Sequence, residues 1–334
     1  MTPPSTAAPT ATPPARPAPS GPSLLRRLVD PANLAEWAAL VALVALVIVF
    51  QALNSTFLSA GNIRSMLVAA AILVILAIGQ TFVVATSGID LSVASTMTLA
   101  AVVLGVTFTA GWPLLACLVA AVVAGGLVGL VNGLLVSRGK ITDFIVTLGT
   151  LSAASGLALL LADGKPKTVI SAPLLRLATG TVGIFGYSVL IAAAFAVVAH
   201  VVLFHTRFGT YVLATGGNAD AANATGVRTA RIKTAVYVIS GTLAGVGAIL
   251  LVARIGAAEP AANTAFLLNS VAAVVLGGVS LFGGRATIVG PVIGALLLTA
   301  LVNGLTLLGV SQFYQPLSVG IVVVLAALLT RFQK

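Results

Sequence analysis

Residues 91–137 read LSVASTMTLAAVVLGVTFTAGWPLLACLVAAVVAGGLVGLVNGLLVS, a run without a single Asp, Glu, Lys or Arg. Crossing the ~30 Å apolar core of a bilayer takes roughly 20 apolar helical residues, so this run is long enough for two crossings. The whole chain is 59% hydrophobic and 7% charged, whereas soluble domains carry about 25% charged residues. These features predict an integral membrane protein.

The same charge-free pattern recurs outward from this run through the rest of the chain. It predicts an all-α, polytopic membrane protein with about ten transmembrane helices, built as one domain. Two of the helices lie in 91–137, and the others are expected near 35–53, 64–86, 144–162, 187–205, 235–254, 267–283, 288–308 and 314–330.

The N-terminal stretch differs from the rest, because Pro, Ala, Thr and Ser dominate it. Such a composition buries too little apolar surface to fold. We expect a disordered, Pro/Ala-rich cytoplasmic tail at 1–33, followed by the transmembrane domain at 34–334.

The net charge of +10 has a topological explanation, since Lys and Arg accumulate in the cytoplasmic loops of membrane proteins. With the N-terminus inside and ten alternating spans, twelve of the 17 Lys and Arg residues fall on the cytoplasmic side. We therefore expect both termini in the cytoplasm and no nucleic-acid partner. The basic residues left outside are Arg64, Lys165, Lys167, Arg176 and Arg254.

The longest polar stretch between the predicted spans is the inner loop 206–234, and Gly216–Gly226 within it has the pattern of a short helix. Asn218 is a good N-cap, Asp220 suits the positive end of the helix dipole, and Gly226 suits a left-handed C-terminal turn. A docking element for a cytoplasmic partner and an ordinary basic loop both fit. Ala221, Ala224 and Thr225 would share one small face, flanked by Arg207, Arg228, Arg231 and Lys233.

Polar side chains in the apolar spans are candidates for a translocation pathway. Asp90 lies where two predicted spans meet almost without a loop. A carboxylate in the hydrocarbon costs at least ~2.5 kcal/mol, so Asp90 is a functional candidate unless it caps the helix that starts beside Ser92. Ser92, beside Asp90, is also a candidate. Gln80, Asn132 and Asn303 are further candidates that could hydrogen-bond a polar substrate, the alternative being bonds between helices.

No ATP-binding or catalytic apparatus is apparent in the sequence. Gly164-Lys165 lacks both the preceding Gly and the following Ser or Thr of a phosphate-binding loop. His200 and His205 have no further metal ligands near them in the sequence. We predict a non-catalytic protein without a cofactor or a metal.

Four stretches of the chain carry motifs that occur together, in this order and with similar spacing, in one known family. They are Gly79-Gln80-Thr81 with Gly88-Ile89-Asp90-Leu91-Ser92; Asn132-Gly133-Leu134-Leu135 with Phe144-Ile145-Val146-Thr147-Leu148-Gly149-Thr150; Ala214-Thr215-Gly216-Gly217-Asn218 with Ala221-Ala222 and Gly226-Val227; and Ala272-Ala273-Val274-Val275-Leu276-Gly277-Gly278 with Phe282-Gly283-Gly284-Arg285. Over roughly residues 40–330 the chain resembles the ribose-, xylose- and galactose-type permeases of ABC importers.

The resemblance implies a membrane subunit of a bacterial sugar importer in the cytoplasmic membrane. In this family two permease chains, identical or related, form the pathway for a pentose or hexose. A cytoplasmic ATP-binding subunit docks on their inner loops, and an extracytoplasmic sugar-binding protein delivers the substrate. The loop 206–234 would then be the coupling segment, in which Gly216, Gly217, Asn218, Ala221, Ala222 and Gly226 receive the ATPase stroke.

Departures from the family pattern are few. Ser87 stands where a Gly usually precedes Gly88, Ala94 stands where a second Gly is usual, and Ala286 follows Arg285 where Gly is commoner. Branched-chain amino acids or nucleosides are alternative substrates within the superfamily, although the Gly88–Ser92 motif favours a sugar. An ion-coupled secondary transporter would need more buried ionisable residues in its spans than Asp90 alone.

Overall fold

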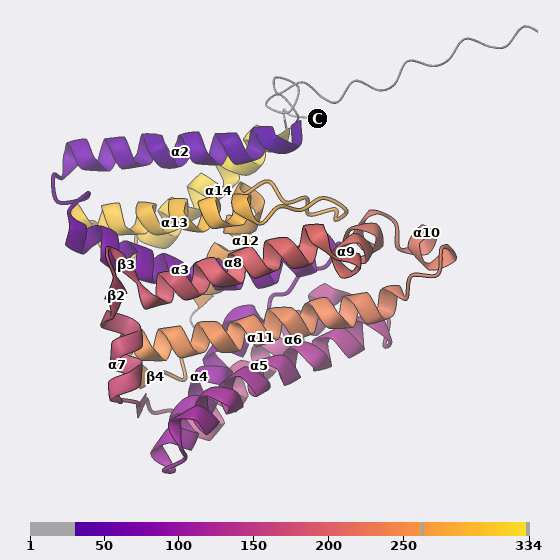
Figure 1. Ribbon diagram of the computed structural model, residues 1–334, viewed down its shortest axis with the longest axis horizontal. Coiled ribbons are helices and arrows are strands. Elements are labelled where there is room, and N and C mark those ends of the chain that lie inside the picture. The colour runs from indigo at the N-terminus through magenta and orange to yellow at the C-terminus, as the bar shows by residue number, and fades with distance from the viewer. Residues whose placement is uncertain (1–30, 262–263, 332–334) are drawn as a thin grey trace, which may run out of the picture.

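The computed structural model describes residues 31–261 and 264–331, with side chains described for 37–324 within these ranges. Long helices lie side by side in one bundle (Figure 1). The expected tail at 1–33 lies outside the described residues except for its last three, which begin α2 (Pro31–Leu53).

Six described helices are long and apolar enough to cross a bilayer. Each corresponds to an expected span, and the helix expected at 187–205 has those bounds. They are α3 (Ala60–Ala85), α5 (Leu114–Ser137), α6 (Asp143–Ala162), α8 (Tyr187–His205), α11 (Thr229–Ile255) and α13 (Val289–Leu307).

Four further apolar stretches are shorter, at 10–17 residues each, and occupy the remaining expected positions. The all-α, polytopic membrane class is therefore confirmed, while the count of about ten crossings stays a prediction. The four are 37–53 within α2, α4 (Val93–Thr109), α12 (Thr264–Leu276) and 315–324 within α14 (Gln315–Arg331).

The span expected at 267–283 is the one whose end was predicted wrongly. α12 ends at Leu276, and residues 277–288 form a loop before α13. Gly278 takes a positive φ of 80°, a conformation that ends a helix. The apolar run continues past this point, which is why hydropathy alone extended the helix.

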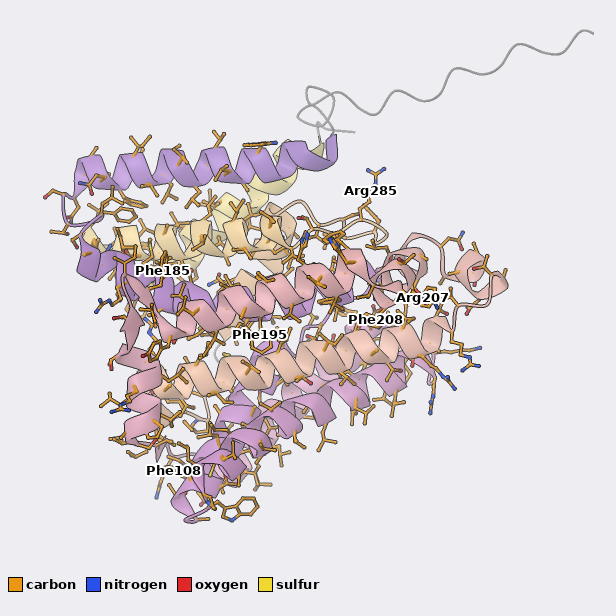
Figure 2. The ribbon with its side chains drawn as sticks, viewed as in Figure 1. Phe108, Phe185, Phe195, Arg207, Phe208 and Arg285 are labelled. Carbon is orange, nitrogen blue, oxygen red and sulfur yellow. The ribbon has the colours of Figure 1, made fainter. Side chains whose placement is uncertain are left out.

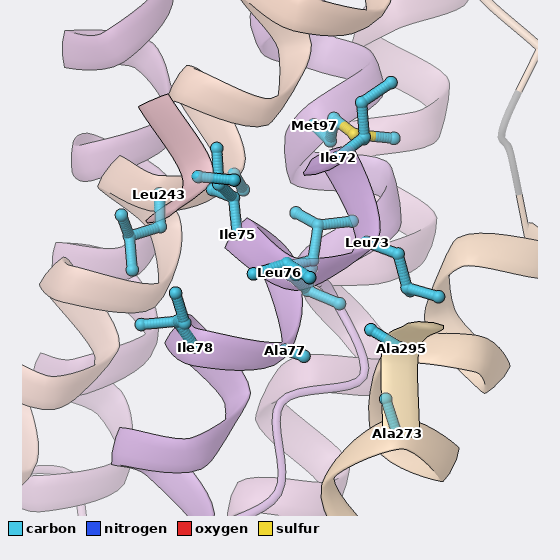
Figure 3. Packing of buried hydrophobic residues seen from close by; sticks show 14 of the residues in the cluster. Ile72, Leu73, Ile75, Leu76, Ala77, Ile78, Met97, Leu243, Ala273 and Ala295 are labelled. Carbon is cyan, nitrogen blue, oxygen red and sulfur yellow. The ribbon is translucent and has the colours of Figure 1, made fainter. Parts of the chain in front are cut away.

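The core of the bundle is built around α3. In its most apolar 18-residue window, 83% of the residues are buried. Figure 3 shows α3 side chains such as Leu76 among Met97 of α4, Leu243 of α11 and Ala295 of α13. Neighbouring helices on several sides of α3 therefore depend on it for their packing.

α5 and α11 make a close helix pair through small residues. A Cβ on Gly129 would meet the Tyr237 carbonyl, and one on Gly241 would meet the Gly125 carbonyl. Such spacing lets two backbones approach and gain van der Waals contact without side chains between them. The glycines on these two helices therefore serve close helix packing.

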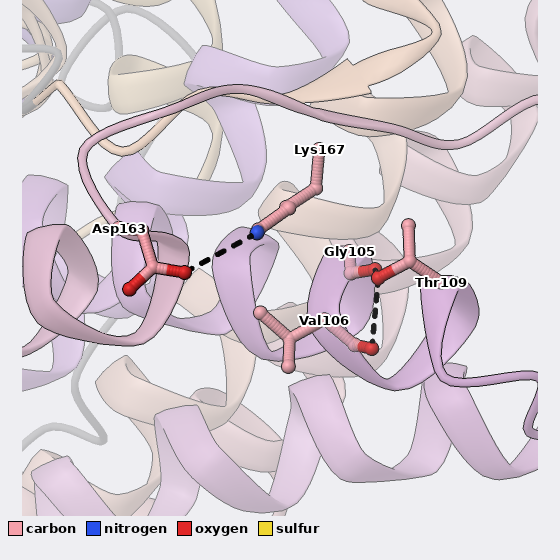
Figure 4. A network of polar contacts seen from close by, with 5 residues as sticks. All are labelled: Gly105, Val106, Thr109, Asp163 and Lys167. Carbon is pink, nitrogen blue, oxygen red and sulfur yellow. Dashed lines mark hydrogen bonds and ion pairs between the residues drawn. The ribbon is translucent and has the colours of Figure 1, made fainter.

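The two ends of the bundle are built differently, and we name them by one element each. The α7 end carries α7 (Ala172–Thr179) and two short antiparallel pairs. There the Asp163 carboxylate lies 3.9 Å from the Lys167 ammonium, and Thr109 Oγ1 donates to the Val106 carbonyl at 3.1 Å (Figure 4). The paired strands are β1 (Lys167–Thr168) with β4 (Ala257–Ala258) and β2 (Thr181–Val182) with β3 (Phe185–Gly186).

Candidate functional site

The opposite end, which we call the α10 end, includes residues 206–234, which the sequence predicts to be an inner loop. These residues fold into α9 (Arg207–Gly217) and α10 (Ala219–Ala224), followed by the start of α11. The helix α9 was not predicted, because its sequence was taken as part of a polar loop. The predicted caps of α10 are confirmed: Asn218 Oδ1 accepts from the Ala221 amide at 2.9 Å, and Gly226 follows with φ +90°.

α10 presents the small face that the sequence predicts. Ala221, Ala224 and Thr225 are exposed, whereas Ala222 faces inward and is buried. Arg207 and Arg285 lie at this end as well (Figure 2), which makes the surface basic. Beside α10 is a hollow of about 500 Å³ lined by Tyr211, Thr225, Gly226, Val227, Arg228, Arg231 and Ile232.

Three segments meet backbone to backbone where α9 ends. Gly216 is buried against the end of α3, and a Cβ there would collide with the Ala85 carbonyl. The Gly284 amide, from the loop 277–288, donates to the same carbonyl at 3.1 Å. Gly217 is exposed, and a Cβ on it would make only an ordinary contact of 3.9 Å with Gly284. The end of α9 thus packs directly on α3 through Gly216.

Residues 86–92, which we call the Asp90 turn, connect α3 to α4 without a regular helix. A non-helical backbone within an apolar bundle needs partners for its amides and carbonyls. The Ile89 amide donates to Asp143 Oδ2 at 3.2 Å, and its carbonyl accepts from Tyr237 Oη at 3.2 Å and Thr147 Oγ1 at 3.3 Å. Side chains from α6 and α11 therefore hold the turn.

Asp90 lies at the centre of a buried cluster. Its Oδ1 accepts from the Ser92 amide at 2.9 Å and from Ser92 Oγ at 2.7 Å, while Oδ2 accepts from Ser240 Oγ at 2.8 Å. Gln80 Nε2 donates to the Asp90 carbonyl at 2.5 Å. Asp90 is 2% exposed and Gln80 fully buried. The carboxylate both orders the start of α4 and reaches α11, so it does more than cap one helix.

The cluster continues through Asn132. Asn132 Nδ2 donates to Ser92 Oγ at 2.8 Å, and Thr150 Oγ1 donates to Asn132 Oδ1 at 2.6 Å. Hydrogen bonds thereby join α3, the Asp90 turn, α5, α6 and α11. We call this set the buried polar network: Gln80, Asp90, Ser92, Asn132, Thr150 and Ser240.

The structure brings together four of the five predicted pathway residues and separates the fifth. Asn303 pairs with Asn62 near the α7 end of α3, each amide donating to the other at 2.9 Å. Sequence reasoning missed Thr150 and Ser240. Each is a hydroxyl in an otherwise apolar helix, a signal that many packing residues share, and Thr150 also ends the motif at residues 144–150.

Comparisons with known proteins agree over most of the chain. Residues 62–328 match the model of a family described as branched-chain amino acid transport system / permease component. The chain is 36% identical to the ribose import permease protein RbsC of Escherichia coli (strain K12) over 318 residues, covering 91% of this chain and 96% of that protein. It is 40% identical to the ribose import permease protein RbsC of Bacillus subtilis (strain 168) over 290 residues, covering 86% and 89%.

A relative with a different named sugar is also similar. The L-arabinose ABC transporter permease protein AraH of Azospirillum brasilense is 34% identical over 290 residues, covering 86% of each chain. No solved structure matches this chain.

Proposed function

The chain belongs to the permease-component family whose model it matches, and we propose that it is the membrane subunit of an ATP-driven monosaccharide importer. Relatives named as ribose and L-arabinose permeases support a pentose or hexose as the substrate. The family description names branched-chain amino acids, so these or nucleosides are the alternative. The subunit forms the pathway and does not itself hydrolyse ATP.

The observation that carries the proposal is the capped, exposed helix α10, which is joined through α9 to the buried helix α3. A cytoplasmic ATP-binding subunit docks on its small face and on the surrounding arginines. Gly216 then passes the displacement to α3, because their backbones touch. The residues assigned to this coupling are Gly216, Gly217, Asn218, Ala221, Ala222 and Gly226.

The orientation follows from the same assignment. The α10 end faces the cytoplasm with both termini, and the four shorter apolar helices complete ten crossings of a bacterial cytoplasmic membrane. The α7 end faces outward and receives the sugar-binding protein. In α5, α6 and α8 only 22% of the most apolar window is buried, so lipid and a second permease chain cover their outer faces.

The buried polar network is assigned to the translocation pathway. Gln80 Oε1 is buried without a hydrogen-bond partner among the described residues. A buried acceptor left in that state costs about 1–3 kcal/mol, and a passing sugar hydroxyl would relieve the cost. Asn303, paired with Asn62, is assigned to helix packing instead.

The test is uptake of labelled pentoses and hexoses by cells with and without this chain, with ATP maintained and the proton gradient collapsed. Chain-dependent accumulation of one sugar under these conditions is the expected result. Uptake that is lost with the gradient would overturn the proposal and make Asp90 the residue to examine for ion coupling. Accumulation of leucine or a nucleoside in place of any sugar would support the alternative substrate.

A further inference from the structure

Ser87 has an unusual backbone conformation for its residue type. Its φ is +60°, in the left-handed region that L-residues other than Gly adopt at a cost in free energy. The permeases that this chain resembles usually have Gly here, which would adopt the conformation freely. A Ser at this position therefore needs a compensating interaction.

The Ser87 hydroxyl supplies that interaction between segments far apart in sequence. Its Oγ lies 3.0 Å from the Gly216 carbonyl at the end of α9 and 2.5 Å from the Phe282 carbonyl in the loop 277–288. The hydroxyl donates to these two carbonyls, of which one belongs to α9 and the other to the loop 277–288. A Gly or an Ala at position 87 would have no donor to replace it.

The backbone of Ser87 belongs to the same turn as Asp90. The Ser87 amide donates to the Val84 carbonyl at 2.9 Å, so the residue is fixed to the end of α3. Two residues later, Ile89 is held by Asp143 and Tyr237. Ser87 thus contacts the coupling segment through its side chain, and the backbone of the Asp90 turn joins it to Asp90 in the buried polar network.

We propose that Ser87 is a positioning residue that ties the coupling segment to the Asp90 turn, so that movement of α9 and α10 displaces the buried polar network. This inference rests on the proposed function, because the movement originates in the ATP-binding subunit. The hydrogen bonds from the Ser87 hydroxyl to the Gly216 and Phe282 carbonyls are contacts that a Gly at position 87 would not make.

The test compares Ser87→Ala, Ser87→Gly and Ser87→Cys in proteoliposomes that contain the complete transporter. The measured quantity is sugar taken up per ATP hydrolysed, using the sugar that the wild-type chain accumulates, beginning with D-ribose. Ala and Gly should both lower this ratio about threefold to fivefold, as expected for one lost hydrogen bond, and Cys, a weak donor, should fall between. The ATPase subunit should co-purify with every variant.

The Gly variant separates the hydroxyl from the backbone. Gly removes the strain at position 87, so a wild-type ratio in Ser87→Gly would show that the hydroxyl has no role and would overturn the inference. Parallel loss of uptake and ATP hydrolysis, with an unchanged ratio, would reduce Ser87 to a structural residue and overturn it as well. The matched control is Ser137→Ala, which removes the 2.8 Å contact with Thr234 in α11 at the same end without touching α9 or α10.

Hydrogen exchange on the purified chain in detergent tests the contact of the Ser87 hydroxyl with α9 in the absence of the ATP-binding subunit and the sugar. Backbone amides at 214–217 should exchange faster in Ser87→Ala and Ser87→Gly than in the wild type or Ser137→Ala. Equal exchange in all four chains would overturn the inference. A wild-type transporter that accumulates no sugar would instead count against the proposed function, and the exchange result would stand apart from it.

Discussion

The two ends of α3 both make polar contacts with other segments, but these contacts are organised differently. Near the α7 end, the half-buried Asn62 and Asn303 pair with each other, and Asn62 Nδ2 also donates to the Phe57 carbonyl at 2.7 Å. Near the α10 end, Gln80 enters a network that crosses five segments and centres on Asp90. A pair of side-chain amides can hold two helices together. A branched hydrogen-bond network next to a surface segment can also transmit a displacement.

The largest difference between the two ends should appear when Asp90 is truncated. Asp90→Ala leaves the Ser240 hydroxyl and the Ser92 amide without their acceptor, which costs about 1–3 kcal/mol for each buried group. We expect uptake to be abolished and the folded chain to resist denaturant less. Asp90→Asn keeps one acceptor oxygen and should retain more folded protein. Normal uptake by Asp90→Ala would remove the network from the mechanism.

The next largest effect should come from the contact between α9 and α3. Gly216→Ala places a Cβ against the Ala85 carbonyl, and overpacking of this kind costs about 1–3 kcal/mol. We expect sugar uptake per ATP hydrolysed to fall about tenfold, measured in proteoliposomes. Gly61→Ala, at the other end of α3, is the matched control, since its Cβ would meet nothing within 4 Å. Equal ratios of sugar taken up to ATP hydrolysed in the two variants would show that the contact between α9 and α3 does not transmit the ATP-driven movement.

The smallest effect should come from the amide pair. A double-mutant cycle with Asn62→Ala and Asn303→Ala should give a coupling energy of about 0.6 kcal/mol, and at most ~1.7 kcal/mol, because interhelical hydrogen bonds in membranes are modest. The measurement is denaturant unfolding in detergent, with uptake per ATP as a second readout that should not change. A large fall in that ratio would place Asn303 in the transport pathway after all.

Sequence reasoning located the helices and the cap residues of α10 well, because charge-free runs and capping side chains are local signals. Hydropathy did not separate core helices from outer ones. The most apolar 18-residue stretches of α3 and α5 have nearly equal mean hydropathy, yet 83% of the residues in the α3 stretch and 22% of those in the α5 stretch are buried. Burial depends on which helices neighbour each face, and a single segment does not encode that.

The site was predicted residue by residue and not as a network. Each pathway candidate was named separately: Gln80, Asp90, Ser92 and Asn132. Contact among these side chains requires the segments of α3, α4 and α5 that carry them to lie at the same depth in the bundle. Ser240 and the left-handed turn at Ser87 were not foreseen as parts of the site. Their roles depend on partners far away in sequence, such as Gly216, 129 residues from Ser87.

The most direct test of the central claim is hydrogen exchange in the assembled transporter, with and without a non-hydrolysable ATP analogue on the partner subunit. The account predicts that nucleotide changes the exchange of amides at 86–92 as well as at 214–226. Amides around Asn62 and Asn303 should stay unchanged and serve as the internal reference. A change confined to 214–226, with the Asp90 turn unaffected, would contradict the claim that the coupling segment moves the buried polar network.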